Sequence, residues 1–135
     1  MTLPPLSTAR ATALTEAFHR LRVLVVGDVM VDRFLIGRVS RISPEAPVPI
    51  LEFDREEQRM GGAANVAHNM AALGGTVTLA AASGRDEGAD LIRDAANAAG
   101  VVARLVADSG RRTTMKTRLV TERNQQVARI DYEND

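Results

Sequence analysis

Short apolar runs alternate with helical segments along most of this chain, and this alternation limits the folds open to it. Val23–Val26 is a continuous apolar run, as in a strand that is covered on both faces. A glycine-bounded helical segment, Gly61–Gly75, precedes a second strand-like run, Thr76–Ala82. Another helical segment, Asp86–Ala99, precedes a third run, Val101–Val106. Strand, helix, strand, helix and strand in this order predict a parallel α/β sheet with crossover helices.

The glycine-bounded helix is the first candidate for a binding element. Gly61 and Gly62 permit unusual backbone dihedrals and a close approach to a ligand, and Gly74 is placed to end the helix. Asn65 falls in the first helical turn, where its amide can both donate to and accept from a sugar hydroxyl. The alternative is an ordinary surface loop followed by a core helix. Helical spacing places three apolar side chains on one face: Val66, Met70 and Leu73.

Two acidic residues follow the first predicted strand. Asp28 comes one step after its end, and ligands of open parallel sheets gather beyond the carboxyl ends of strands. Asp32 lies four residues later, so a helical or turn-like link would bring both carboxylates to one side. As alternatives, Asp28 stabilises a turn through its side chain and Asp32 is a solvated charge.

Prolines 44, 47 and 49 mark an irregular segment that cannot be helical. It joins two extended segments, Phe34–Val39 and Val48–Phe53, which we expect at a sheet edge or outside the main sheet, as a flap. The charged run Asp54–Arg59 that follows is expected to be a solvated connector.

Near the end of the chain, Thr113–Thr121 and Gln126–Asp131 have strand composition and predict a hairpin. Lys116 would share a face with Arg118, and Arg129 with Asp131. A basic pair beside a ligand can clamp a phosphate, although ordinary cross-strand pairing also explains these charges.

Composition excludes several classes of function. The chain has 17 basic and 17 acidic residues, no cysteine and only 3% aromatic residues, so neither a disulfide framework nor base stacking on aromatic platforms is expected. No apolar run reaches the length of a membrane span, and a cytoplasmic protein is expected. Asp86 and Glu87 are interpreted as helix caps, and His19 and His68 as structural residues.

Five segments together resemble one protein family. They are Gly27–Asp32, Arg41–Pro49 with the sequence RISPEAPVP, Gly61–Ala67 with the sequence GGAANVA, and the hairpin residues Lys116–Arg118 and Asn124–Gln126. The chain is similar to the amino-terminal part of ribokinase-like sugar kinases. Within that family it most resembles the bacterial D-glycero-D-manno-heptose 7-phosphate kinases of lipopolysaccharide-core synthesis.

The resemblance implies a three-layer α/β body with a small β-sheet lid that often completes a homodimer. It implies that Asp28 and Asn65 bind sugar hydroxyls, that Gly61 and Gly62 permit close approach, and that Asp32 is a secondary candidate. Lys116 and Arg129 become candidates for the phosphate of the substrate. ATP and Mg²⁺ are the implied cofactors.

Helical spacing predicts a tail and a helix within residues 1–21, which packs on the sheet or on a partner. The resemblance implies that residues 22–135 are the first part of the kinase domain, with lid segments at about 34–53 and 113–131. The family's Gly-Ala-Gly-Asp element, with its anion hole and catalytic base, has no match here. We therefore expect a fragment that is inactive alone. The alternatives are a kinase for another sugar or a non-catalytic binding or dimerisation module.

Overall fold

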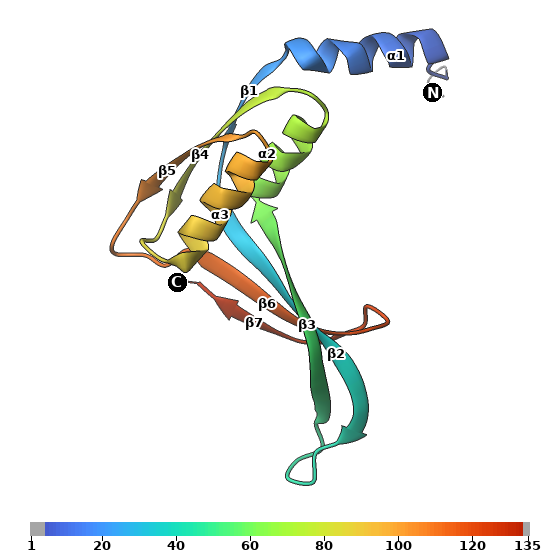
Figure 1. Cartoon of the computed structure of the whole chain (residues 1–135), viewed down its shortest axis with the longest axis vertical. Coiled ribbons are helices and arrows are strands. Elements are labelled where there is room, and N and C mark those ends of the chain that lie inside the picture. The colour runs from blue at the N-terminus through green and yellow to red at the C-terminus, as the bar shows by residue number, and fades with distance from the viewer. Residues whose placement is uncertain (1–4, 134–135) are drawn as a thin grey trace, which may run out of the picture.

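The computed structural model describes residues 5–133, which form two β-sheets and three α-helices (Figure 1). In chain order the elements are α1 (Thr8–Ala17), the 3-10 helix η1 (Phe18–Arg20), β1 (Arg22–Val26), β2 (Val29–Ile42), β3 (Pro49–Gly62), α2 (Ala63–Ala72), β4 (Thr76–Ser83), α3 (Glu87–Ala98), β5 (Val102–Ala107), β6 (Thr114–Thr121) and β7 (Gln126–Tyr132).

The first sheet is parallel, with strand order β1-β4-β5, and it confirms the predicted α/β arrangement. Helices α2 and α3 cover one face of this sheet (Figure 1). Side chains alternate along β4, so that Val77 and Leu79 are buried beneath the helices and pack with Ile92 of α3. The opposite face is open: Leu24 is 64% exposed and Val26 71%.

The second sheet, called the lid sheet here, has the order β3-β2-β6-β7. Strand β2 runs antiparallel to β3 and parallel to β6, and β6 and β7 form the predicted hairpin. Val29 and Val31, at the start of β2, are buried in the main core. From there β2 and β3 extend together into a long arm that points away from α1 (Figure 1). The predicted flap is therefore confirmed as a separate sheet, joined to the body at one end.

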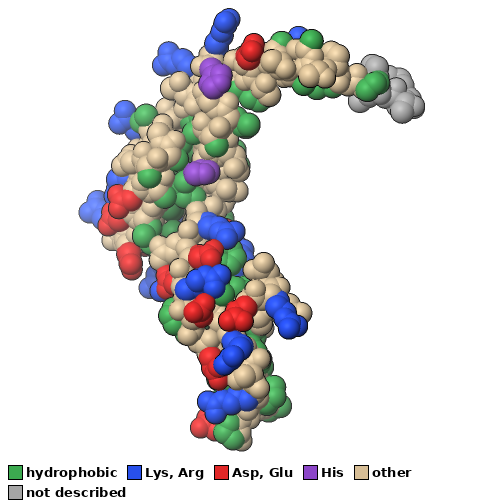
Figure 2. All heavy atoms as spheres, turned by 45° about the vertical axis from the view of Figure 1, so that its right-hand side comes forward, with side chains coloured by type: hydrophobic (Ala, Val, Ile, Leu, Met, Phe, Trp, Pro, Cys, Tyr) green, Lys and Arg blue, Asp and Glu red, His purple; other side chains and the backbone are tan. Residues whose placement is uncertain are grey.

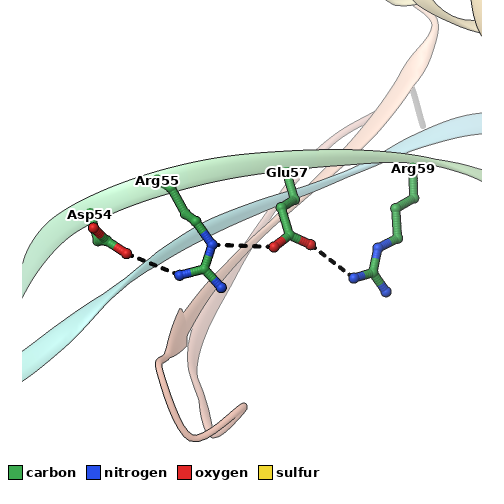
Figure 3. Close-up of polar contacts among 4 residues, drawn as sticks. All are labelled: Asp54, Arg55, Glu57 and Arg59. Atoms are coloured by element: carbon green, nitrogen blue, oxygen red, sulfur yellow. Dashed lines mark hydrogen bonds and ion pairs between the residues drawn. The ribbon is translucent and has the colours of Figure 1, made fainter.

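The lid strands are longer than the sequence predicted, and the prediction of a connector at Asp54–Arg59 is wrong. These six residues belong to β3, and all but Asp54, which lies at a register shift, pair with β2. Their charges are accommodated because they pair with one another along the strand: Arg55 contacts both Asp54 and Glu57, and Glu57 contacts Arg59 (Figure 3). The prediction of a helical or turn-like link between Asp28 and Asp32 is also wrong, because the residues between them belong to strand β2.

The ends of the two body helices agree with the prediction. Gly74 and Gly100 follow α2 and α3 with φ angles of 96° and 72°, which favour glycine. Asp86 caps α3 by accepting a hydrogen bond from the Ala89 amide at 3.1 Å.

The other helical faces differ from a simple amphipathic pattern. In α2 the small residues Ala64 and Ala67 face the core, whereas the apolar row Val66, Met70 and Leu73 is exposed. Helix α1 has no buried residue and lies at one end of the molecule (Figure 1), so packing of residues 8–17 on the sheet is not observed. Residues 1–4 of the predicted tail, and 134–135, lie outside the described part.

Candidate functional site

The glycine pair lies where β3 ends and α2 begins, beside the turn between β1 and β2. Gly62 has φ 57°, and a Cβ atom there would collide with the carbonyl oxygen of Asp28. The Ala63 amide donates a hydrogen bond to that oxygen at 2.8 Å. The absence of a side chain at Gly62 therefore allows a close contact within the protein, between Gly62 and the Asp28 backbone. It fixes Asp28 to the start of α2 through the backbone and leaves its side chain exposed.

Asp32 has the more enclosed carboxylate of the two acidic candidates, at 22% side-chain exposure. Its Oδ1 atom accepts a hydrogen bond from Arg118 Nη1, which is 23% exposed. Its Oδ2 atom lies over Gly61, where an added Cβ would be 2.7 Å away. Asp32 therefore requires a glycine at position 61, and the carboxylate and the glycine pair form one local unit.

Asn65 lies on the first turn of α2 and lines a cavity of about 550 Å³ between α2, α3 and the end of β3. Its Oδ1 atom is 3.5 Å from Asn69 Nδ2. Arg59, Met60 and His68 also line this cavity, but Asp28 does not. Asp28 is therefore bonded through its backbone to the start of α2, two residues before Asn65. The Asp28 side chain does not share the cavity that Asn65 lines.

Strand register places eight side chains on one face of the lid sheet, called the charged face here. They are Asp32 and Phe34 of β2, Glu57 and Arg59 of β3, Lys116 and Arg118 of β6, and Arg129 and Asp131 of β7. Figure 2 shows acidic and basic side chains interleaved along the lower half of the molecule, where the arm lies.

Lys116 and Arg129, the two phosphate candidates, differ in how their charges are satisfied. Arg129 Nε forms an ion pair with Asp131 at 2.8 Å. Lys116 lies in register between Asp32 and Asp131, yet each of these carboxylates already pairs with an arginine. Among residues 5–133, Lys116 makes no ion pair, so its ammonium group is the more available of the two for an anion.

Phe34 is a site residue that the sequence did not suggest. The guanidinium carbons of Arg59 and Arg118 lie 4.9 Å and 5.4 Å from the centre of its ring, which is within the range of cation–π attraction. Arg59 is held in turn by Glu57 at 2.9 Å. The hydrogen bond from Arg59 is the main cause that lowers the pKa of the Glu57 carboxyl, with Arg55 adding to it against a smaller effect of burial. Both arginines of this aromatic contact are therefore anchored by carboxylates.

The described residues contain no metal site and no membrane span. Among residues 5–133, no three His, Asp or Glu side chains lie close enough together to hold a metal ion. Within the same range, no helix has the length and apolar character needed to cross a membrane.

Comparison with known proteins agrees with this geometry. The family model for pfkB family carbohydrate kinases matches residues 20–135. The chain belongs to this family. Its pfkB portion covers β1 to β7 and excludes residues 1–19.

The pfkB relatives are longer than this chain. A D-beta-D-heptose 7-phosphate kinase of Bordetella bronchiseptica is 53% identical over 118 residues, which are 87% of this chain and 37% of that protein. A carbohydrate kinase from Agrobacterium tumefaciens superposes with a TM-score of 0.69 at 25% identity, over 83% of this chain and 35% of the other. A fructokinase from Xylella fastidiosa, solved with bound ATP, gives a TM-score of 0.60 at 26% identity, over 82% and 32%. The chain therefore spans between about a quarter and a little more than a third of the length of these and other matched proteins.

Proposed function

We propose that this chain is the sugar-binding and lid portion of an ATP-dependent kinase that phosphorylates the anomeric hydroxyl of D-glycero-D-manno-heptose 7-phosphate. The observation that carries the proposal is the pairing of two chemistries on the charged face. A carboxylate, Asp32, lies beside the glycine pair and can accept from sugar hydroxyls. An unpaired ammonium, Lys116, lies on the adjacent strand and can bind a phosphate. The 53% identity to a heptose 7-phosphate kinase supports the same substrate.

Each candidate residue has a role in this proposal. Asp32 accepts from sugar hydroxyls, and Asn65 donates to or accepts from another. Asp28 is a further hydroxyl ligand at the mouth of the site, where its side chain is exposed. Gly61 and Gly62 lack the Cβ atoms that would meet Asp32 Oδ2 and the Asp28 carbonyl oxygen, and they permit close approach of the sugar. Lys116 binds the 7-phosphate.

Arg129 is the second phosphate ligand of the proposal, and it would have to exchange Asp131 for the phosphate. The Arg129 side chain is 47% exposed in its present ion pair at 2.8 Å, so its guanidinium group is accessible to such an exchange.

The transfer itself needs groups beyond this chain. The anomeric oxygen bonds to the γ-phosphorus of ATP, the bond from that phosphorus to the β–γ bridging oxygen breaks so that ADP leaves, and the hydroxyl proton passes to a base. We assign that base, the anion hole and the ATP and Mg²⁺ sites to the remainder of a full-length protein, because the relatives extend far beyond this segment. The segment alone is then inactive. Its own contribution is to position the sugar phosphate, a large part of catalysis in phosphoryl transfer.

The proposal includes a homodimer formed through the lid and a cytoplasmic location, where ATP and sugar phosphates are available for lipopolysaccharide-core synthesis. Strand β3 is an edge of the lid sheet and carries alternating charges at Arg55, Glu57 and Arg59. Two copies of this edge running antiparallel can place Glu57 of one beside Arg59 of the other, in both directions at once.

Titration calorimetry and a kinase assay on the full-length protein test the proposed function. We expect it to bind heptose 7-phosphate and to consume ATP with it, in preference to a panel of other sugars and sugar phosphates. Tight binding of another sugar, with none of heptose 7-phosphate, would end the heptose assignment. A reading frame that stops without a Gly-Ala-Gly-Asp element would instead favour a non-catalytic binding or dimerisation module.

A further inference from the structure

The ion pair between Arg118 and Asp32 is unlike the other ion pairs of residues 5–133. Both of its side chains are less than a quarter exposed, whereas every other pair has at least one member that is 38% exposed or more. Exposed pairs contribute little, whereas the loss of one partner costs more as a pair becomes more enclosed. The partly buried pair of Arg118 and Asp32 is therefore the one in which each side chain depends most on the other.

The two oxygens of the Asp32 carboxylate have different surroundings. Oδ1 accepts the hydrogen bond from Arg118. Oδ2 lies over Gly61 and accepts no hydrogen bond from the described residues. Arg118 thus bonds to Oδ1 of Asp32 and leaves Oδ2 free, beside Gly61, where the backbone carries no side chain.

Arg118 is itself held in place from two sides. Its guanidinium group lies over the ring of Phe34, whose other arginine neighbour, Arg59, is anchored by Glu57. It also lies directly opposite Arg129 in the β6–β7 register. Like charges opposite each other in a sheet are unfavourable, and the two carboxylates Asp32 and Asp131 relieve this repulsion. Arg118 therefore has one preferred partner, Asp32, and an aromatic surface that aligns it.

We propose that Arg118 is a positioning residue: it holds Oδ1 of Asp32 so that Oδ2 faces the sugar hydroxyl, and it thereby links the lid hairpin to the sugar site. This inference rests on the proposed function. It differs from a direct role in which Arg118 and Lys116 together bind the phosphate. In the positioning role Arg118 acts only through Asp32, so its effect on sugar binding disappears once that carboxylate is gone.

Two double-mutant cycles in the full-length protein, with calorimetric titration of heptose 7-phosphate, separate these roles. Arg118→Met alone should weaken binding by about ten-fold or more, as expected for loss of a charged hydrogen bond. Combined with Asp32→Asn, it should weaken binding no further than Asp32→Asn alone. Combined with Lys116→Met, its fold-change should multiply with that of Lys116→Met.

The opposite pattern would overturn the proposal: fold-changes that multiply with Asp32→Asn, or that vanish in the Lys116→Met background. Arg38→Met is the matched control, because it removes an exposed arginine–glutamate pair from β2, the strand that carries Asp32, and it should leave sugar affinity unchanged. If Arg118→Met does not fold, Arg118→Lys keeps the charge and should show the same dependence on Asp32. Wild-type protein that binds no heptose 7-phosphate would refute the proposed function, not the role of Arg118.

Discussion

At the scale of single residues, the enclosed position of Asp32 is what the sequence least anticipated. Sequence reasoning ranked Asp28 higher because it follows a buried strand. In the structure Asp32 gains its position from Arg118, 86 residues away, and from Gly61 on the neighbouring strand. Spacing along β2 could not reveal either contact, because both depend on the register with which β3 and β6 pair with β2.

Gly61→Ala tests this local unit. The added Cβ would lie 2.7 Å from Asp32 Oδ2 and 2.6 Å from Met30 Cγ, so the Asp32 side chain must move. We expect an about ten-fold higher KM for the sugar phosphate in the full-length kinase and a loss of about 1–3 kcal/mol in unfolding free energy. Gly100→Ala is the control: its φ of 72° makes it cost about 1 kcal/mol, with no change in KM. Equal KM values for both variants would separate Gly61 from the site.

Asp86 gives a prediction about pH. Burial acts to raise the pKa of its carboxyl, but hydrogen bonds from the backbone and side chain of Thr113 and from the Ala89 amide outweigh it, so the pKa lies below the ordinary 3.8. A lowered folded-state pKa stabilises the protein above the unfolded-state value, and this contribution is lost as the pH falls through the folded-state value.

We therefore expect wild type to be more stable than Asp86→Asn at neutral pH by about 1 kcal/mol. The difference should shrink as the pH falls below 3.8. Urea unfolding of both proteins at several pH values measures it. A difference that stays constant down to the lowest pH would show that the charge of Asp86 does not act in this way.

At the scale of elements, local patterns predicted the body better than the lid. Apolar runs and glycine stops located β1, β4, β5, α2 and α3 within a residue or two, because these elements bury one face each. The lid strands depend on cross-strand pairing of charged residues, such as the bidentate contact of Arg33 with Glu56 at 2.8 and 2.7 Å. Charge runs in a single sequence resemble solvated loops, so Asp54–Arg59 was misassigned.

The β6–β7 turn is an element whose geometry gives a clear test. Asn124 has φ 59°, a left-handed conformation that glycine and asparagine tolerate and β-branched residues do not. Asn124→Val should lower the unfolding free energy by about 1–2 kcal/mol, whereas Asn124→Gly should be nearly neutral. Thermal unfolding of the two variants measures the contrast. Equal effects would mean that the turn relaxes to another conformation.

At the scale of the whole molecule, the chain leaves apolar surface open on both layers of its body. Leu24, Val26 and Val106 project from the uncovered face of the parallel sheet, and Val66, Met70 and Leu73 from α2. Contiguous exposed apolar surface of this kind promotes association. Of the predicted three layers, the described residues form two: the parallel sheet and the helices α2 and α3 on one of its faces.

We expect the 135-residue segment, expressed alone, to self-associate or to be poorly soluble. Leu24→Thr with Val26→Thr keeps β-branched residues in β1 while it removes apolar surface, and should reduce association. Sedimentation velocity on both forms measures this. A monodisperse monomer that melts cooperatively would contradict the expectation.

The central claim is that Asp32, Asn65 and Lys116 bind one sugar phosphate beneath the lid. A crystal structure of the full-length protein with heptose 7-phosphate tests it most directly. The account predicts a sugar hydroxyl within hydrogen-bond distance of Asp32 Oδ2, another at the Asn65 amide, and the phosphate at Lys116. A sugar phosphate bound elsewhere, with Asp32 contacting only Arg118, would contradict it.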